Sequence, residues 1–468
     1  MLGFIILDTM TQPNSAPKTP ISIHTLKKGL PAQRATRTKV LVRIVAPERP
    51  VSDQINNTPR RAPVDLAIVI DRSGSMTGKP LTAAIGCARN LIKSLSNDDR
   101  VAIVTFDDEI QVLQPLAELS EREVFYTKLS GVEAGGSTAL FDGWKEGAKQ
   151  LAPFTSAKRT SRVILLTDGQ ANKGLVDTAA IAEQVAELAR SGVTTSTVGL
   201  GTEFNESLLT KMADAGEGQA HYGQTPEDLE DSFAEEFQIL NKAWLRKVTL
   251  SVTAGTGVVA NILKRDGSKD AEVKLGTLPY GAALDAVVQL DIGVHRQSSS
   301  LLSAHASAID IDGKVINLGP VILSLPELDA EALEALPDDE IVKAAVAESD
   351  LADEFLRIHK LASTGKIAEA IAAIKELKAR PGATAWAERT AKYIVNLADE
   401  DLESAIKELS YSSRAFRGRT REAEAFVAYS SNYNVSVENS KDVFLAKKLG
   451  AGRSQRRSAR EENPGESI

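Results

Sequence analysis

Long apolar runs alternate with amphipathic segments between Val64 and about Leu240. The run "VDLAIVID" is apolar at successive positions, which is typical of a strand covered on both faces. Similar runs recur at "RVAIVTF", "RVILLT" and "VTTSTVGLG", and segments with helical spacing of apolar residues separate or follow them, the last being "TPEDLEDSFAEEFQIL" at residues 225–240. This alternation predicts an α/β unit, a doubly wound and mostly parallel sheet with helices on both faces.

Two departures from that pattern extend the prediction. The segment "RVAIVTFDDEIQVLQPL" contains two strands around a tight Asp107-Asp108 turn, so one edge strand is expected to be antiparallel. Short alternating runs separated by Gly, Asp and Asn fill residues 246–325, and "TKVLVRIVAP" (residues 38–47) has the same character. We therefore expect a β-sandwich formed by strands from both sides of the α/β unit, which is inserted into it.

The remaining segments are a helical region and the two ends of the chain. After Pro326 the apolar spacing is helical, with stops at Gly365 and Pro381-Gly382. The predicted division is a flexible start (1–20), strands followed by a proline-bounded linker (21–63), the α/β domain (64–242), the β-sandwich (243–326), the helical region (327–435) and a disordered tail (436–468).

Composition and charge argue against several classes of protein. The 468 residues carry a net charge of −8, which gives no electrostatic footprint for nucleic acid, and a single cysteine, Cys87, excludes an intramolecular disulfide. No basic region precedes the apolar run in "MLGFIILDTM", so we expect no signal peptide, and no apolar stretch is long enough to span a bilayer. A cytoplasmic location is the expectation.

Oxygen-bearing side chains follow the strands of the predicted sheet. Asp71 ends the first strand and Asp168 follows "RVILLT", and in parallel sheets the carboxyl ends of the strands are where ligands bind. Ser73 and Ser75 come directly after Asp71, and Thr138 stands after a Gly135-Gly136 loop at the start of a helix. Five oxygen donors are therefore expected to converge.

This donor set indicates a hard divalent cation. Magnesium prefers oxygen ligands and needs few carboxylates, and neutral hydroxyls leave the ion able to take a further anionic ligand. The five histidines form no close pair and no HExxH occurs, which disfavours a zinc protease.

Three segments together resemble a von Willebrand factor type A domain. The stretch Asp71-Arg72-Ser73-Gly74-Ser75, Thr138 and the stretch Thr167-Asp168-Gly169 match the loops of that family's metal-ion-dependent adhesion site. The resemblance implies bound Mg²⁺ (or Mn²⁺ or Ca²⁺) and a Glu or Asp of a partner protein that completes its coordination. The order of strands around the domain also resembles inter-alpha-trypsin inhibitor heavy chains and chloride-channel regulators.

Other interpretations of these residues remain open. Asp71 or Ser73 could merely cap a helix. Solvated turn carboxylates are the favoured interpretation of Asp107 and Asp142. Cys87 is expected to be a buried thiol, and the three tryptophans to be packing residues. The basic strip "RAFRGRTR" (residues 414–421) is interpreted as a solvated helix end rather than a phosphate site.

Three functions follow from the site. The favoured one is a non-enzymatic protein that binds an acidic residue of a partner through the metal within a larger assembly, with no membrane span and no nucleic acid. The alternatives are a metal-dependent hydrolase or phosphatase and a secreted adhesin. An aspartyl nucleophile of the haloacid-dehalogenase kind usually has a second Asp two residues on, where this chain has Ser73, and no general base is evident.

Overall fold

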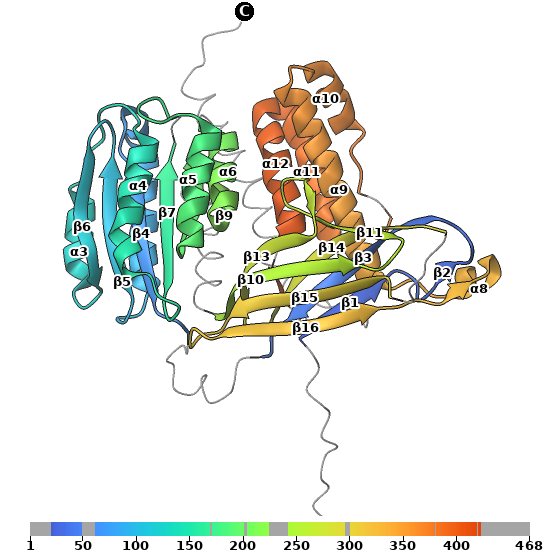
Figure 1. Ribbon diagram of the computed structural model, residues 1–468. Helices are drawn as coiled ribbons and strands as arrows, with labels where there is room; N and C mark the ends of the chain where they lie inside the picture. Colours follow the sequence, from blue (N-terminus) through green and yellow to red (C-terminus); the bar gives the residue numbers. More distant parts are fainter. Residues whose placement is uncertain are drawn as a thin grey trace, which may run out of the picture.

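The computed structural model describes residues 20–48, 61–168, 171–200, 204–223, 242–294, 300–379, 381–418 and 420–422. Within these residues the chain forms an α/β domain, two facing β-sheets and a group of helices that stands on one of those sheets (Figure 1). The expected helix at 225–240, the tail at 436–468 and nearly all of the flexible start lie outside the described residues. None of the described helices is both long and apolar enough to cross a membrane.

The α/β domain is built on a six-stranded sheet in the order β6-β5-β4-β7-β8-β9. All neighbouring strands are parallel except the edge pair β5 and β6, which confirms the antiparallel edge expected from the Asp107-Asp108 turn. Strand β9 was not expected from the sequence. The strands are β4 (Val64–Asp71), β5 (Arg100–Phe106), β6 (Ile110–Glu118), β7 (Thr160–Thr167), β8 (Val193–Leu200) and β9 (Glu217–Gly223).

Helices cover both faces of this sheet because alternate residues of its buried strands point to opposite sides. Leu66 and Ile68 pack with α2 (Lys79–Ser94) and α3 (Arg122–Ser130). Ala67 and Val69 pack on the other face with α4 (Leu140–Leu151), α5 (Thr178–Arg190) and α6 (Glu206–Ala215). The described part of the domain also contains two short 3₁₀ turns, at Gly74–Met76 and Ala152–Phe154.

The β-sandwich is split around the α/β domain, as the sequence predicts. Strand β3, which precedes that domain, pairs along its whole length with β14, which follows it. One sheet has the order β1-β3-β14-β11-β12, with β18 also on β14, and the other has the order β13-β10-β15-β16. The strands of the first sheet are β1 (Ile21–Thr25), β3 (Thr36–Val45), β14 (Ala282–Ile292), β11 (Val258–Leu263), β12 (Lys269–Asp270) and β18 (Thr420–Glu422). Those of the second are β13 (Glu272–Pro279), β10 (Ala243–Ala254), β15 (Leu302–Ile309) and β16 (Val315–Leu323).

The helical region stands on the sandwich beside the α/β domain (Figure 1). It begins with β17 (Glu327–Leu328), which pairs with β2 (Leu30–Pro31). Val342 and Ala345 of its longest helix pack on Leu41 of β3, and the helices share a core of their own. Its helices are α8 (Ala330–Ala335), α9 (Glu340–Ser363), α10 (Ile367–Lys375), α11 (Ala385–Glu400) and α12 (Leu402–Gly418).

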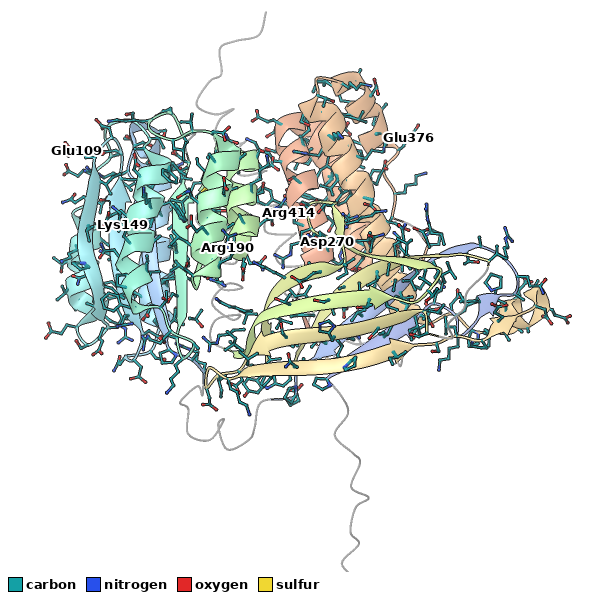
Figure 2. The ribbon with its side chains drawn as sticks, in the orientation of Figure 1. Glu109, Lys149, Arg190, Asp270, Glu376 and Arg414 are labelled. Atoms are coloured by element: carbon teal, nitrogen blue, oxygen red, sulfur yellow. The ribbon has the colours of Figure 1, made fainter. Side chains whose placement is uncertain are left out.

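The interpretation of "RAFRGRTR" as a solvated helix end is wrong for its first two arginines. Arg414 forms an ion pair with Asp214 of α6 and donates to the carbonyl of Thr210 at 3.2 Å, and burial lowers the pKa of its guanidinium to about 10. Arg417 pairs with Asp353 of α9. Figure 2 places Arg414 between the helical region and the α/β domain. These ion pairs connect α12 to α6 and α9. The side chains of Arg419 and Arg421 lie outside the described part of the chain.

Candidate metal centre

Two predicted ligands stand at the carboxyl end of adjacent strands. Strand β4 ends at Asp71, and β7 ends at Thr167, immediately before Asp168. The strands are parallel and Ile70 is paired with Leu166, so both carboxylates lie at one edge of the sheet. In Figure 1 this edge is at the top of the α/β domain, away from the sandwich. We call it the carboxyl edge.

Hydrogen bonds connect four of the five predicted ligands. The backbone nitrogen of Ser73 donates to Asp71 Oδ1 at 2.8 Å. The Oγ atoms of Ser73 and Ser75 are 3.2 Å apart, and Ser75 Oγ donates to Asp168 Oδ1 at 2.9 Å. The chain of contacts runs from one carboxylate to the other through both serine hydroxyls, so these four of the five predicted ligands lie together.

The loop that carries Thr138 is fastened to the same edge. The nitrogen of Gly135 donates to the carbonyl of Arg72 at 2.7 Å, and the nitrogen of Gly74 donates to the carbonyl of Gly136 at 3.1 Å. Thr138 itself is 3% exposed, and its backbone nitrogen donates a hydrogen bond to Asn172 Oδ1 at 2.9 Å. Its hydroxyl forms no hydrogen bond to any residue that the structure describes.

Gly136 is required where these loops meet. Its φ of +70° is a backbone conformation that residues with a side chain rarely adopt. A Cβ at this position would lie 2.0 Å from Asp108 Oδ1 and 3.0 Å from the Cβ of Asp107. The glycine pair therefore brings the third loop close to the strand end.

The carboxylates of Asp71 and Asp168 are both buried. Asp71 is fully buried and Asp168 is 8% exposed, and neither forms an ion pair with a residue that the structure describes. Burial raises the pKa of Asp71, with a further rise from the charge of Asp107, against hydrogen bonds from Thr167 and Ser73. Burial also raises the pKa of Asp168, with a contribution from the charge of Asp71, against a hydrogen bond from Ser75. Among the described residues, no cation neutralises the charges of Asp71 and Asp168.

Asp107 differs from the solvated turn carboxylate that we expected. The residue is 6% exposed. Asp107 Oδ2 lies 3.2 Å from Nη2 of Arg72, and Asp107 Oδ1 accepts a hydrogen bond from the backbone nitrogen of Glu109 at 2.8 Å. Its backbone carbonyl accepts the nitrogen of Ala139, next to Thr138. Because Asp107 directly follows β5, a neighbour of β4, the rule about strand ends that identified Asp71 would also have found it.

Helix capping does not account for the serines. Ser73 precedes the 3₁₀ turn Gly74–Met76 without a side-chain capping bond, and the residue before α2 is Gly78.

The other expectations for neighbouring residues hold. Asp142 is exposed, Cys87 is 3% exposed, and Trp144 is buried while the other two tryptophans pack at the edges of other cores.

The residues fit a hard cation better than a soft one. The described residues contain no group of three or more His, Cys, Asp or Glu placed to hold a metal, so a site at this edge needs its hydroxyls. Two carboxylates and three hydroxyls are the oxygen donors that Mg²⁺ accepts, with water in the remaining positions. Two buried carboxylates with no cationic partner among the described residues are what such an ion would neutralise.

Comparison with known proteins gives a family match for the α/β domain. The sequence profile of the von Willebrand factor type A domain matches residues 65–235. Uncharacterized protein sll0103 of Synechocystis sp. is 26% identical over 255 residues, which are 54% of this chain and 60% of the relative. Inter-alpha-trypsin inhibitor heavy chain H3 of Homo sapiens is 29% identical over 188 residues, 37% of this chain and 21% of the relative. The alignments therefore span at most 60% of these relatives.

Two solved structures share the fold over most of the chain. A von Willebrand factor type A protein from Catenulispora acidiphila covers 86% of this chain and 98% of its own, with a TM-score of 0.64 and 17% identity. The ArnB paralog VWA2 from Sulfolobus acidocaldarius covers 85% and 97%, with a TM-score of 0.57 and 16% identity. These likenesses concern the fold, and they extend beyond the α/β domain to the flanking regions. The chain thus contains a von Willebrand factor type A domain, matched at residues 65–235.

Proposed function

We propose that the carboxyl edge binds Mg²⁺ and that the ion binds an acidic residue of a partner protein. Von Willebrand factor type A domains commonly mediate protein–protein interaction. The observation that carries the metal part of the proposal is the burial of Asp71 and Asp168 beside each other without a cation among the described residues. Buried charges are stable when they are paired or coordinate a metal.

Each ligand has a separate role in this proposal. Asp71 and Asp168 supply the negative charge, and Ser73, Ser75 and Thr138 supply neutral oxygens. The hydroxyls coordinate the ion without adding negative charge beyond that of the two carboxylates, so the bound ion would still take a further anionic ligand. The ion supplies electrostatic attraction for a carboxylate of the partner. The three loops, held together by the bonds of Gly74 and Gly135, keep the donors at one place.

The remaining parts of the proposal concern the ion and the assembly. Mg²⁺ is preferred to Ca²⁺ because Ca²⁺ takes six to eight ligands, often with bidentate carboxylates, whereas this edge offers few charged donors. Binding rather than catalysis is proposed, and a cytoplasmic location remains a separate proposal that cell fractionation tests.

A capture experiment tests the function. The full chain is immobilised, incubated with lysate in Mg²⁺, and the retained proteins are quantified by mass spectrometry after elution with EDTA. Asp71→Asn has nearly the same shape and lacks the charge. Glu123→Gln, on the exposed side of α3, is the matched control. We expect one set of proteins to be retained by wild type and Glu123→Gln and lost from Asp71→Asn.

The captured protein then provides a test of the acidic contact. Each Glu and Asp in its binding region is replaced by Gln or Asn, and the affinity for this chain is measured in Mg²⁺ and in EDTA. A single replacement is expected to reduce the affinity in Mg²⁺ to the level found in EDTA. Retention that is the same in EDTA, or in Asp71→Asn, would contradict the proposal.

A further inference from the structure

A pocket lies at the opposite end of the central sheet, where the α/β domain meets the sandwich. It is lined by the start of β7, β8 and β9, by the end of α5 and by residues of β10, β13 and β15. Its volume is about 250 Å³. We call it the amino-end pocket because the parallel strands begin there, at the lower end of the α/β domain in Figure 1.

Positive charge dominates the described lining of this pocket. Its one carboxylate is Glu217, and the ammonium of Lys274 lies 2.6 Å from that carboxylate. The cations among the described lining residues are Arg159, Arg162, Arg190, Arg246 and Lys247. A concentration of cations in a chain of net charge −8 does not follow from overall composition.

These cations differ in how far they are already neutralised. Arg159 forms an ion pair of 2.7 Å with the buried Asp65, and Arg162 Nε donates to the hydroxyl of Thr194 at 3.0 Å. Arg190 and Lys247 form no ion pair with a residue that the structure describes. Figure 2 shows Arg190 at the end of the α/β domain that faces the sandwich.

Arg246 is buried in the wall of the pocket and is held by carbonyl groups. Its guanidinium donates to the carbonyls of Arg159 at 2.8 Å and Asp310 at 2.9 Å, and also to that of Ala157. Burial lowers its pKa, although the charge of Asp310 opposes that shift. Its Nε and the nearby hydroxyl of Ser161 are buried without a hydrogen-bond partner. The wall thus contains donors for which the described protein supplies no acceptor.

We propose that the amino-end pocket binds a small, multiply charged phosphate compound. Guanidinium groups match the geometry of phosphate oxygens and bind them through paired hydrogen bonds. Cations gathered in a recess also raise the local concentration of anions. The pocket volume suits a small molecule. Since both domains line the pocket, the ligand would join the α/β domain to the sandwich.

Titration calorimetry with pyrophosphate on the full chain tests this site. The buffer contains EDTA and no divalent cation, so the carboxyl edge carries no metal. The double variant Arg190→Gln/Lys247→Gln removes two cations that make no ion pair among the described residues. Lys93→Gln/Lys360→Gln removes the same charge from exposed positions outside the pocket. We expect at least a tenfold loss of affinity in the first variant and less than a twofold loss in the second.

Two further measurements test whether the pocket prefers phosphate to carboxylate and whether it binds independently of the carboxyl edge. Citrate, which has carboxylates of similar total charge, is expected to bind at least fivefold more weakly than pyrophosphate, and Asp71→Asn is expected to bind pyrophosphate as wild type does. No measurable binding of pyrophosphate, equal losses in the two double variants, or a preference for citrate would overturn the proposal. Failure here would leave the metal proposal intact, because the calorimetry contains no metal.

Discussion

The two ends of the central sheet carry opposite charge and are built in different ways. At the carboxyl edge, Asp71 and Asp168 are buried without a cation among the described residues. At the amino-end pocket, Arg246 is buried with carbonyl groups in place of carboxylates. The first end is formed by loops of one domain, whereas the second needs residues of both the α/β domain and the sandwich.

This difference explains why the carboxyl edge could be predicted from the sequence and the amino-end pocket could not. The loops of the carboxyl edge follow strands directly, so their chemistry stands beside recognisable apolar runs. The pocket combines Arg190 with Lys247, which are far apart in sequence and belong to different domains. Its charge becomes visible only when the domains are placed together.

The largest change in the free energy of unfolding is expected from removing Arg246 at the amino-end pocket. Arg246→Ala would leave the carbonyls of Arg159, Ala157 and Asp310 without their shared donor, at a cost of about 3 kcal/mol in the free energy of unfolding. Arg190→Ala, at an exposed position, should change that free energy by less than about 0.5 kcal/mol. Urea denaturation of both variants measures the difference; equal values would mean that Arg246 does not fasten the domains.

A smaller effect is expected from a side chain at Gly136. Gly136→Ala would place a residue with a Cβ at φ +70° and against Asp108, which should cost about 1–2 kcal/mol. Gly131→Ala is the control, because the nearest atom to its added Cβ is 3.8 Å away. Thermal denaturation followed by circular dichroism compares them. Equal melting temperatures for the two variants would show that the loop does not need its glycine.

Removing the hydroxyl of Ser75 should weaken Mg²⁺ binding at the carboxyl edge. Ser75→Ala loses the bond to Asp168 and one proposed ligand, and we expect about a tenfold loss of Mg²⁺ affinity, or about 1.4 kcal/mol. Ser156→Ala, in the lining of the amino-end pocket, should leave Mg²⁺ affinity unchanged. Calorimetry with Mg²⁺ measures both. An unchanged affinity in Ser75→Ala would remove that hydroxyl from the proposed ligand set.

The smallest effect should come from Asp107, which acts through charge. Asp107→Asn would remove a negative charge close to Asp71 and leave Arg72 without its ion pair, and both changes disfavour a cation. We expect a two- to fivefold loss of Mg²⁺ affinity, equivalent to about 0.4–1 kcal/mol. Glu123→Gln removes the same charge elsewhere and should have no effect. A loss of a hundredfold would instead indicate that Asp107 touches the ion.

Sequence patterns predicted the layout well where the signal was local. The apolar run ending at Asp71, the antiparallel edge beyond Asp107 and the strands on both sides of the inserted domain are all found. Strand β9 was missed because Glu217–Gly223 contains few apolar residues. The ion pair of Arg414 was missed because it depends on a partner distant in sequence. Asp107 was missed although it directly follows a strand, the same local signal that identified Asp71.

Direct measurement of Mg²⁺ binding tests the central claim most sharply. Titration calorimetry on the full chain should give one strong site for wild type, and none for Asp71→Asn or Asp168→Asn, while Glu123→Gln binds as wild type does. A saturating excess of 100 times the dissociation constant should also stabilise wild type by about 2.7 kcal/mol. Equal Mg²⁺ binding by wild type and Asp71→Asn would contradict the claim that the carboxyl edge holds the ion.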